Sequence, residues 1–399
     1  MRNALLKSLQ WFENSGVMLP SDGLWGVAER VAVITGNSAV EEMKREFHAW
    51  TIHDGYCIIE QRRADCNFET AYLYLLAYEV FKDKKYYDIA VNILDFLYFR
   101  SGLLNRSQRE YQPGSWNWSH IKRENSVFFD DEAWCIFFQL EIGDRYAELE
   151  KRYDMKYWAL LLADSLNAGA QKVMLEKFLT PDGHWVDYSK HWLGSLDLPH
   201  WGALTCMALA RADFAAKRKP AAFIRNYYDY LEANAEKFNP SEKAYACLGA
   251  CAVYNYTADE YFKEMAERFG SLLIEKMQEN GNLPAEHYEA PVGEHLVDTI
   301  YTVNWSLLAL QSLKNIVPEF SAAYEKIKGL VLKIQDDSPE KQFSGCWRGM
   351  FDLKLNTWGG GDRFEGGAGS IYTGWTNAPI ASVMALDILG KDIFSWGRK

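Results

Sequence analysis

Apolar residues recur along most of the chain with the spacing of amphipathic helices. The pattern predicts twelve helices, at about 2–15, 67–81, 84–99, 126–143, 154–177, 200–216, 219–235, 242–255, 258–277, 297–315, 318–334 and 374–390. Strict alternation of apolar and polar residues is nearly absent, so we expect strands only as short pairs within the long connections. The pattern therefore predicts an all-α fold.

The predicted helices alternate in how their apolar residues are distributed. The even-numbered helices are apolar on nearly every side, as in ALTCMALA at 203–210 and YACLGACAVY at 245–254, whereas the odd-numbered helices carry a charged stripe, as at 259–277. A helix that is apolar all round is buried, and a helix with one charged face lies at the surface. Six inner helices surrounded by six outer helices make an (α/α)6 toroid of six helical hairpins.

The connections between these helices also alternate in length. Each even-numbered helix is followed by a short link, whereas the odd-numbered helices are mostly followed by long connections, at about 16–66, 100–125, 178–199, 236–241, 278–296 and 335–373. All the long loops then fall on one face of the toroid, where they lead into the N-termini of the inner helices. Loops on a rigid scaffold commonly carry function, and helix N-termini favour negative charge. We therefore expect the functional site on that face.

Composition supports one domain, residues 1–399, because no linker interrupts the helical pattern. The net charge of −11, without a basic stripe, argues against nucleic acid and anionic membranes as partners. No Cys or His spacing indicates a metal, and we expect no cofactor. The first residues form an amphipathic helix and no run is long enough to span a membrane, which predicts a cytoplasmic protein, or a periplasmic or secreted one if an export signal was removed. The sequence leaves the oligomeric state open.

Aromatic residues make up 15% of the chain, including 15 tryptophans. Several lie in polar, Gly-rich segments rather than in helices, among them Trp116 and Trp118 in PGSWNWSH and Trp358 in NTWGGGDRF. Exposed rings beside polar groups suit sugars, which present C–H faces to a ring and hydroxyl groups to its edge. We therefore expect a carbohydrate as the binding partner.

Candidate acids lie at the starts of the inner helices. Asp130 and Asp131 open the second inner helix among aromatic residues, in FFDDEAW, where burial and like charge would raise a carboxyl pKa toward that of a general acid. Helix capping is the structural alternative. Asp65 opens the first inner helix and serves either as a cap or at the site. Arg62 and Arg63 precede it and could bind a substrate carboxylate or an acidic loop residue.

Two further segments complete the candidate site. His200 and Trp201 begin the third inner helix, where the histidine could transfer a proton or donate to a hydroxyl. The last connection is rich in glycine and offers one candidate catalytic carboxylate, Glu365, with the candidate substrate-binding residues Arg363, Tyr372, Trp375 and Asn377. In the first connection, Trp25, Glu29 and Arg30 could fold over the same cleft.

The chain resembles the six-hairpin glycosidase superfamily in its WFENSGV, DGLWGVAERV, FFDDEAW and GGAGSIYTGWTNAPI segments. The paired aspartates look like those of bacterial endo-α-1,6-mannanases. The placement of Asp131 and His200 on successive inner helices is similar to that in unsaturated glucuronyl hydrolases. The closing segment resembles six-hairpin hydrolases of Bacteroidetes-type glycan degraders, some of which release glucuronic acid. The resemblance implies a glycosidase with an (α/α)6 toroid.

We therefore expect a glycoside hydrolase acting on an oligo- or polysaccharide, with an exo-acting, β-glucuronidase-like enzyme on a uronate-containing glycan as one form. Asp131 would be the general acid assisted by Asp130, and Glu365 or Asp65 the base that activates water. Trp375, Trp201 and Tyr372 would stack on sugar rings. The alternatives are a sugar 2-epimerase, which usually needs two opposed histidines, a polysaccharide lyase, and a non-enzymatic carbohydrate-binding toroid.

Overall fold

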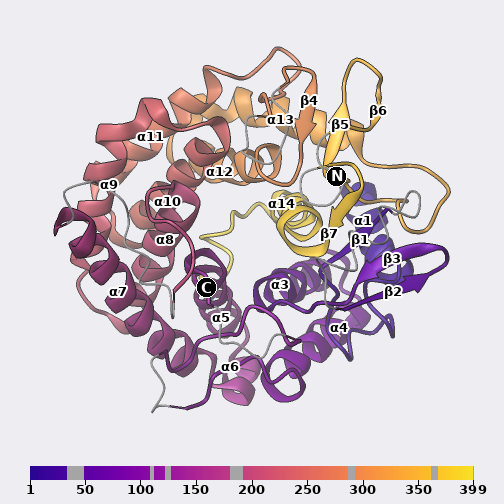
Figure 1. The fold of residues 1–399 in the computed structure, drawn as a ribbon, viewed down its shortest axis with the longest axis horizontal. Coiled ribbons are helices and arrows are strands. Elements are labelled where there is room, and N and C mark those ends of the chain that lie inside the picture. The colour runs from indigo at the N-terminus through magenta and orange to yellow at the C-terminus, as the bar shows by residue number, and fades with distance from the viewer. Residues whose placement is uncertain are drawn as a thin grey trace.

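The computed structural model describes residues 1–33, 49–107, 112–121, 127–179, 192–285, 293–360 and 367–398. Within them, six helices form a closed inner ring in which each contacts the next and the last contacts the first (Figure 1). These helices are α3 (Ala64–Phe81), α5 (Phe129–Arg145), α8 (Pro199–Ala216), α10 (Pro240–Thr257), α12 (Val303–Ile316) and α14 (Ala378–Leu389). They are the even-numbered helices of the sequence pattern, which confirms the predicted fold.

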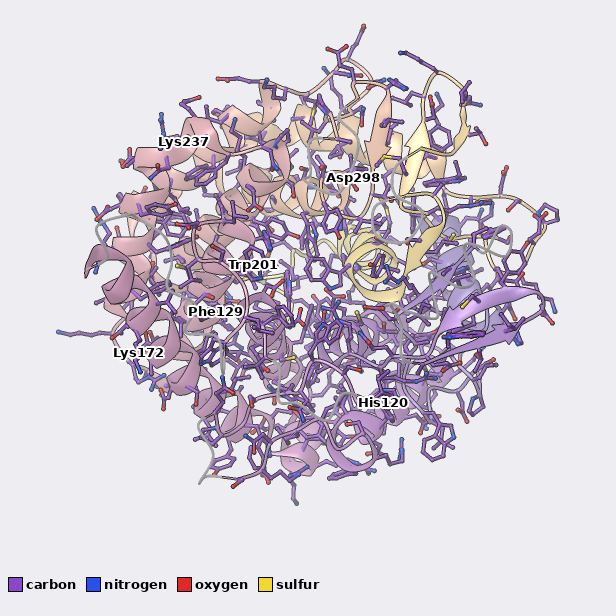
Figure 2. The ribbon with its side chains drawn as sticks, viewed as in Figure 1. His120, Phe129, Lys172, Trp201, Lys237 and Asp298 are labelled. Atoms are coloured by element: carbon purple, nitrogen blue, oxygen red, sulfur yellow. The ribbon has the colours of Figure 1, made fainter. Side chains whose placement is uncertain are left out.

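An outer ring of helices surrounds the inner one (Figure 1). It consists of α1 (Arg2–Asn14), α4 (Lys84–Asp95), α7 (Met155–Leu179), α9 (Ala222–Asn234), α11 (Glu260–Ile274) and α13 (Ser321–Ile334). A short helix that the pattern did not predict, α6 (Ala147–Tyr153), lies between α5 and α7. Figure 2 shows Lys172 and Lys237 on the outside of the ring and Phe129 and Trp201 further in. In α1, α4, α9, α11 and α13 the buried residues recur at helical spacing, so these helices bury one face each, as the charged stripes predicted.

The inner helices begin at recognisable residues. Pro199, Pro240 and Pro379 each occupy the first turn of their helix, where a missing N–H is not needed. Three predicted starts of inner helices, at 126, 297 and 374, were too early, because α5, α12 and α14 begin at Phe129, Val303 and Ala378. Residues 296–298 form strand β4 (Leu296–Asp298), and a π-helical turn, η4 (Thr373–Asn377), precedes α14. Further short turns are η1 (Phe96–Arg100), η2 (Ala235–Lys237) and η3 (Pro318–Phe320).

Short strands tie the long connections together. Strands β1 (Arg30–Ala32), β2 (Trp50–His53), β3 (Tyr56–Ile59) and β7 (Ser370–Tyr372) form an antiparallel sheet in the order β2-β3-β1-β7. A second sheet joins β4 to β5 (Met350–Asp352) and β6 (Thr357–Trp358). Arg30 on β1 lies opposite Tyr372 on β7, so the first and last connections meet on one face of the toroid.

Residues 392–398 close the opposite end of the ring. The Trp396 ring packs edge-on against Tyr72 of α3, and the Gly397 N–H donates to Glu141 of α5 at 3.0 Å. Glu141 also accepts from Arg211 of α8 at 2.6 Å. None of the described helices is both long enough and apolar enough to span a membrane.

Candidate active site

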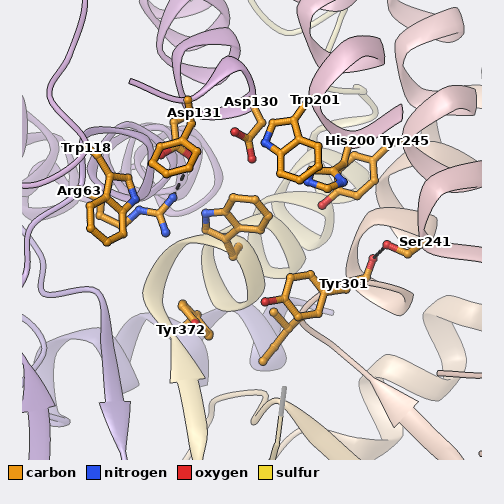
Figure 3. Close-up of a pocket in the computed structure, with 13 residues that line it drawn as sticks. Arg63, Trp118, Asp130, Asp131, His200, Trp201, Ser241, Tyr245, Tyr301 and Tyr372 are labelled. Carbon is orange, nitrogen blue, oxygen red and sulfur yellow. Dashed lines mark hydrogen bonds and ion pairs between the residues drawn. The ribbon is translucent and has the colours of Figure 1, made fainter. Parts of the chain in front are cut away.

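A cavity of about 300 Å³ lies where the inner helices begin (Figure 3). Every inner helix contributes to its wall, either from its first turns or from the connection that enters it. The lining residues are Arg63, Trp118, Phe128, Asp130, Asp131, His200, Trp201, Ser241, Tyr245, Ile300, Tyr301, Tyr372 and Trp375. The cavity therefore lies on the face that the alternating connections predicted.

Asp130 and Asp131 occupy the first turn of α5 and both line the cavity (Figure 3). They are 4% and 6% exposed, and one carboxylate oxygen of each, Oδ1 of Asp130 and Oδ2 of Asp131, has no hydrogen-bond partner. Burial raises the pKa of Asp131 well above its ordinary value; the Arg63 guanidinium opposes that shift, and the neighbouring acids Asp65, Asp130 and Glu132 add to it. Burial also raises the pKa of Asp130, but nearby His200 and Arg63 counteract that shift. The two carboxyls therefore have different electrostatic neighbours, since His200 acts on Asp130 and the adjacent acids act on Asp131.

Arg63 links these aspartates to the first connection and to α3. Its guanidinium lies 2.7 Å from Asp131, 2.9 Å from Asp65 and 3.3 Å from Glu29. The same guanidinium lies 5.5 Å from the ring centres of Trp118 and of Trp375, within the range of cation–π attraction. Arg63 thus binds an acidic loop residue and two helix-start acids, which was one of the two predicted alternatives.

Asp65 supports the cavity wall without lining it. Its carboxylate accepts from Arg63 at 2.9 and 3.2 Å and from the Trp375 indole Nε1–H at 2.8 Å, and it is 1% exposed. Glu69, one turn later, accepts from the Trp375 backbone N–H at 2.9 Å. These bonds hold Trp375 at a backbone φ of 51°. The structure does not place Asp65 where a water-activating base is needed, because its oxygens already bind Arg63 and Trp375.

His200, at the start of α8, forms a buried pair with Glu242 of α10. The imidazole Nδ1 lies 2.7 Å from Glu242 Oε1, and the His200 backbone N–H donates to Oε2 at 2.8 Å. Burial lowers the pKa of His200, but the carboxylates of Glu242 and Asp130 outweigh it, so the pKa is raised overall. A protonated imidazole here stabilises an ionised Asp130 across the cavity.

Buried carboxyls outnumber the cations around this cavity. Burial raises the pKa of Glu69 well above its ordinary value, with nearby Asp65 adding to the effect, and burial likewise raises that of Glu132. Glu132 accepts the Trp116 backbone N–H at 2.8 Å and so anchors the second connection to α5. Burial thus favours the protonated form of these carboxyls, which is the form that a general acid needs.

Several sequence-predicted residues lie elsewhere. The Trp116 ring packs edge-on against Phe68 and Tyr98 and is 2% exposed, so it belongs to the core and cannot stack on a sugar. Asn377 is fully buried and bonds the backbone of Trp347 and Tyr372, a structural role. Arg62 and Trp25 lie outside the cavity wall, where Arg62 pairs with Glu60 and donates to the Trp25 carbonyl. Arg363 and Glu365 lie outside the described residues.

The structure adds cavity residues that the sequence analysis missed. Tyr245 and Ser241 come from the first turns of α10, Tyr301 precedes α12, and Phe128 is the residue before α5. Their shared signal is position, because each lies at the start of an inner helix. The sequence pattern placed Tyr245 in the apolar core of its helix, because a tyrosine in an apolar run is expected both in a packed core and in a cavity wall.

No protein-family model matches the chain, and no curated protein matches its sequence. Solved structures do match its fold. A D-mannose isomerase superposes with a TM-score of 0.57 at 13% identity, covering 98% of this chain and 96% of that one. An inactive α-1,6-mannanase variant from a Salegentibacter species, with two adjacent aspartates replaced by asparagine and α-1,6-mannotriose bound, gives 0.55 at 11% identity over 96% and 98%.

An unsaturated glucuronyl hydrolase from a Bacillus species superposes with a TM-score of 0.51 at 13% identity, covering 96% of this chain and 95% of that one. The closed double ring of helices defines the protein as an (α/α)6 toroid. These hydrolases and the isomerase share its fold, which is the fold that the sequence resemblance implied. Hydrolases and sugar isomerases share this fold, so the reaction must be argued from the cavity.

Proposed function

We propose that the protein is a glycoside hydrolase whose catalytic pair is Asp130 and Asp131. The observation that carries the proposal is the position of both carboxyls in one cavity, each with an oxygen free of protein partners. Glycosidases use one carboxylic acid to protonate the leaving oxygen and one carboxylate to attack or to activate water. A buried pair with different electrostatic neighbours meets that requirement.

The neighbours assign the roles within the pair. Asp131, whose pKa burial raises most clearly, donates its proton to the glycosidic oxygen as the bond between that oxygen and the anomeric carbon breaks. Asp130, beside protonated His200, is the ionised partner that either takes a proton from the attacking water or first bonds the anomeric carbon. One water is added overall. In direct displacement the proton that Asp130 takes from the water returns to Asp131 through solvent, whereas in the covalent route Asp131 itself takes a proton from the water that releases the sugar. This assignment gives Asp130 the role that the sequence analysis gave to Asp65 or Glu365.

Aromatic rings form the rest of the cavity wall. Trp118, Trp201 and Trp375 line it, and Tyr301 and Tyr372 add hydroxyl groups (Figure 3). Rings of this kind offer faces to the C–H groups of a sugar. The cavity volume of about 300 Å³ is at the lower end for ligand pockets, which favours a short segment of glycan over a long bound chain.

A sugar epimerase or isomerase is the second candidate. It is favoured by the His200–Glu242 pair, since a carboxylate that orients an imidazole is a common arrangement for a general base. Among the described residues that line the cavity, His200 is the one histidine, whereas the expected epimerase chemistry uses two. For this reason we place the hydrolase first.

The test is a screen against neutral and uronate-containing glycans with three readouts. New reducing ends support a hydrolase, an unsaturated product indicates a lyase, and a changed monosaccharide without loss of chain length indicates an epimerase. On a hydrolysed substrate, we expect Asp131→Asn and Asp130→Asn each to lower kcat/KM at least about a hundredfold. Full activity in both variants would refute the assignment. Asp352→Asn is a suitable control, because Asp352 lies on β5, outside the cavity wall.

A further inference from the structure

The positive charge on the cavity wall is already neutralised. Among the described residues that line the cavity, Arg63 carries the one guanidinium, and it lies within 3.3 Å of oxygens of Glu29, Asp65 and Asp131. Even with Asp131 protonated as the general acid, Arg63 keeps Glu29 and Asp65 as partners and has little charge left to hold another anion. A substrate carboxylate would instead approach Asp130 and Asp131.

Other nearby cations are also engaged. Arg62 pairs with the Glu60 carboxylate and donates to the backbone carbonyls of Glu60 and Trp25. Arg30 lies 3.5 Å from Glu29 and 4.5 Å from the centre of the Tyr372 ring. His200 is held by Glu242. Within the part of the chain that the structure describes, the site therefore has an acidic rather than a basic character.

The polar cavity atoms that have no protein partner are neutral donors and carboxylate oxygens rather than cations. The Tyr245 hydroxyl and the Trp201 indole N–H are buried and unpartnered, like Oδ1 of Asp130 and Oδ2 of Asp131. All four residues line the same cavity, and Tyr245 is 1% exposed. Leaving such atoms unpaired is costly, so a ligand or water must bind them. Neutral donors beside carboxylate acceptors match hydroxyl groups, which donate and accept at once.

We infer that the sugar unit held in this cavity is a neutral, hydroxyl-rich pyranose and that uronic acids are rejected there. Tyr245 is the residue that selects it, by bonding one of its hydroxyl groups. The inference rests on the proposed function, since it assumes a carbohydrate ligand in the cavity. It departs from the glucuronidase-like activity that the sequence resemblance implied.

Matched pairs of ligands test the inference. Oligomers of mannuronate, glucuronate and galacturonate are compared with their carboxyl-reduced manno-, gluco- and galacto-counterparts of the same linkage and length, and α-1,6-mannotriose is included. Calorimetry gives Kd for the wild-type protein near neutral pH. We expect every pair that binds to favour the neutral member by about tenfold or more. Tighter or equal binding of the acidic member, or no binding by any neutral oligomer, overturns the inference.

Binding and turnover are measured separately, so that the two proposals fail differently. If a neutral oligomer binds more tightly but no new reducing ends form, the hydrolase assignment fails while the inference stands. If an acidic oligomer is bound more tightly and is hydrolysed, the inference fails while the hydrolase assignment stands.

Tyr245→Phe tests the proposed selecting residue. The change removes a hydroxyl that has no protein partner and keeps the ring that packs on Trp305 at 5.3 Å, so the fold should be retained. Loss of one hydrogen bond should weaken binding of the best neutral oligomer by about tenfold. Tyr254→Phe, near the far end of the same helix, is the matched control and should leave Kd unchanged. Equal Kd values for Tyr245→Phe and wild type would remove Tyr245 from the proposal.

Discussion

His200 and Glu242 join two neighbouring inner helices at the wall of the cavity. Glu242 accepts both the His200 Nδ1–H at 2.7 Å and the His200 backbone N–H at 2.8 Å, and both side chains are largely buried. The Glu242 carboxylate lies in the first turn of α10, and Asn239 caps that helix by accepting the Glu242 N–H. These bonds engage Nδ1 and fix the orientation of the imidazole, which leaves Nε2 available to a ligand in the cavity.

The pH dependence of stability should reveal this pair. Because the pKa of His200 in the folded protein is raised above its ordinary value of 6.5, the folded state binds the His200 proton more tightly than the unfolded state does. Its contribution to the free energy of unfolding is complete below that value and is lost as pH rises through the raised pKa. In Glu242→Gln, Asp130 alone opposes the effect of burial on the pKa of His200, so this loss of stability should become smaller. Urea unfolding of both proteins over a pH series measures it. Glu267→Gln, on the exposed face of α11, should behave as wild type, and an unchanged slope in Glu242→Gln would contradict the prediction.

Asp131→Asn should separate stability from activity. Burial raises the pKa of Asp131 well above its ordinary value of 3.8, so its contribution to stability is greatest below that value and is lost as pH rises through the raised pKa. Asparagine cannot ionise, and Arg63 keeps Glu29 and Asp65 as partners. We expect the inactive variant to be more stable than wild type by about 1 kcal/mol at neutral pH, with the difference shrinking in acid. Urea denaturation at several pH values measures the difference. A lower stability of Asp131→Asn than of wild type at neutral pH would contradict the prediction.

Gly374 allows η4 to lie close to α3. A Cβ atom at this position would lie 2.6 Å from Cys66 Sγ and 2.7 Å from Cys66 Cα, and would also contact Glu69. Because a backbone atom cannot move aside as a side chain does, Gly374→Ala should cost about 1–3 kcal/mol of stability and displace Trp375. Gly329→Ala is the control, since a Cβ on this exposed position of α13 meets nothing within 4 Å. Gly329→Ala should raise the free energy of unfolding by at most about 1 kcal/mol, because alanine favours a helix more than glycine does. Equal unfolding midpoints for the two variants would contradict the prediction.

Arg211 holds together the end of the toroid opposite the cavity. It donates to Glu141 Oε1 at 2.6 Å and to the Leu140 carbonyl at 3.0 Å, and is 1% exposed. Arg211→Ala leaves Glu141 buried without its cation, which should cost about 3–5 kcal/mol. Arg152→Ala breaks an exposed pair with Asp95 and should cost no more than about 1 kcal/mol. Chemical denaturation measures the loss of stability in both variants. Equal losses would contradict the prediction that the buried Arg211–Glu141 pair stabilises the fold more than the exposed pair does.

The sequence was sufficient for the fold because helical periodicity is a local property. The inner helices read as apolar on every side and the outer ones as amphipathic, and ring closure follows from burying both. It also located the Asp130–Asp131 pair, since an acid pair at a buried helix start is visible in the chain. Boundaries failed where a turn replaced the first helical residues, as at Asp298, whose carboxylate accepts the Ile300 and Tyr301 N–H groups instead.

What the chain alone determined was which helices are buried and which face carries the long loops. Which buried groups become partners was decided only by the closed ring, because it brings together residues far apart in sequence. Trp116 and Trp118 lie in one motif, yet the first packs on Phe68 in the core and the second lines the cavity. Arg63 meets Glu29 and Asp131 from separate elements. Local periodicity carries no information on such distant contacts, and they give the cavity its acidic character.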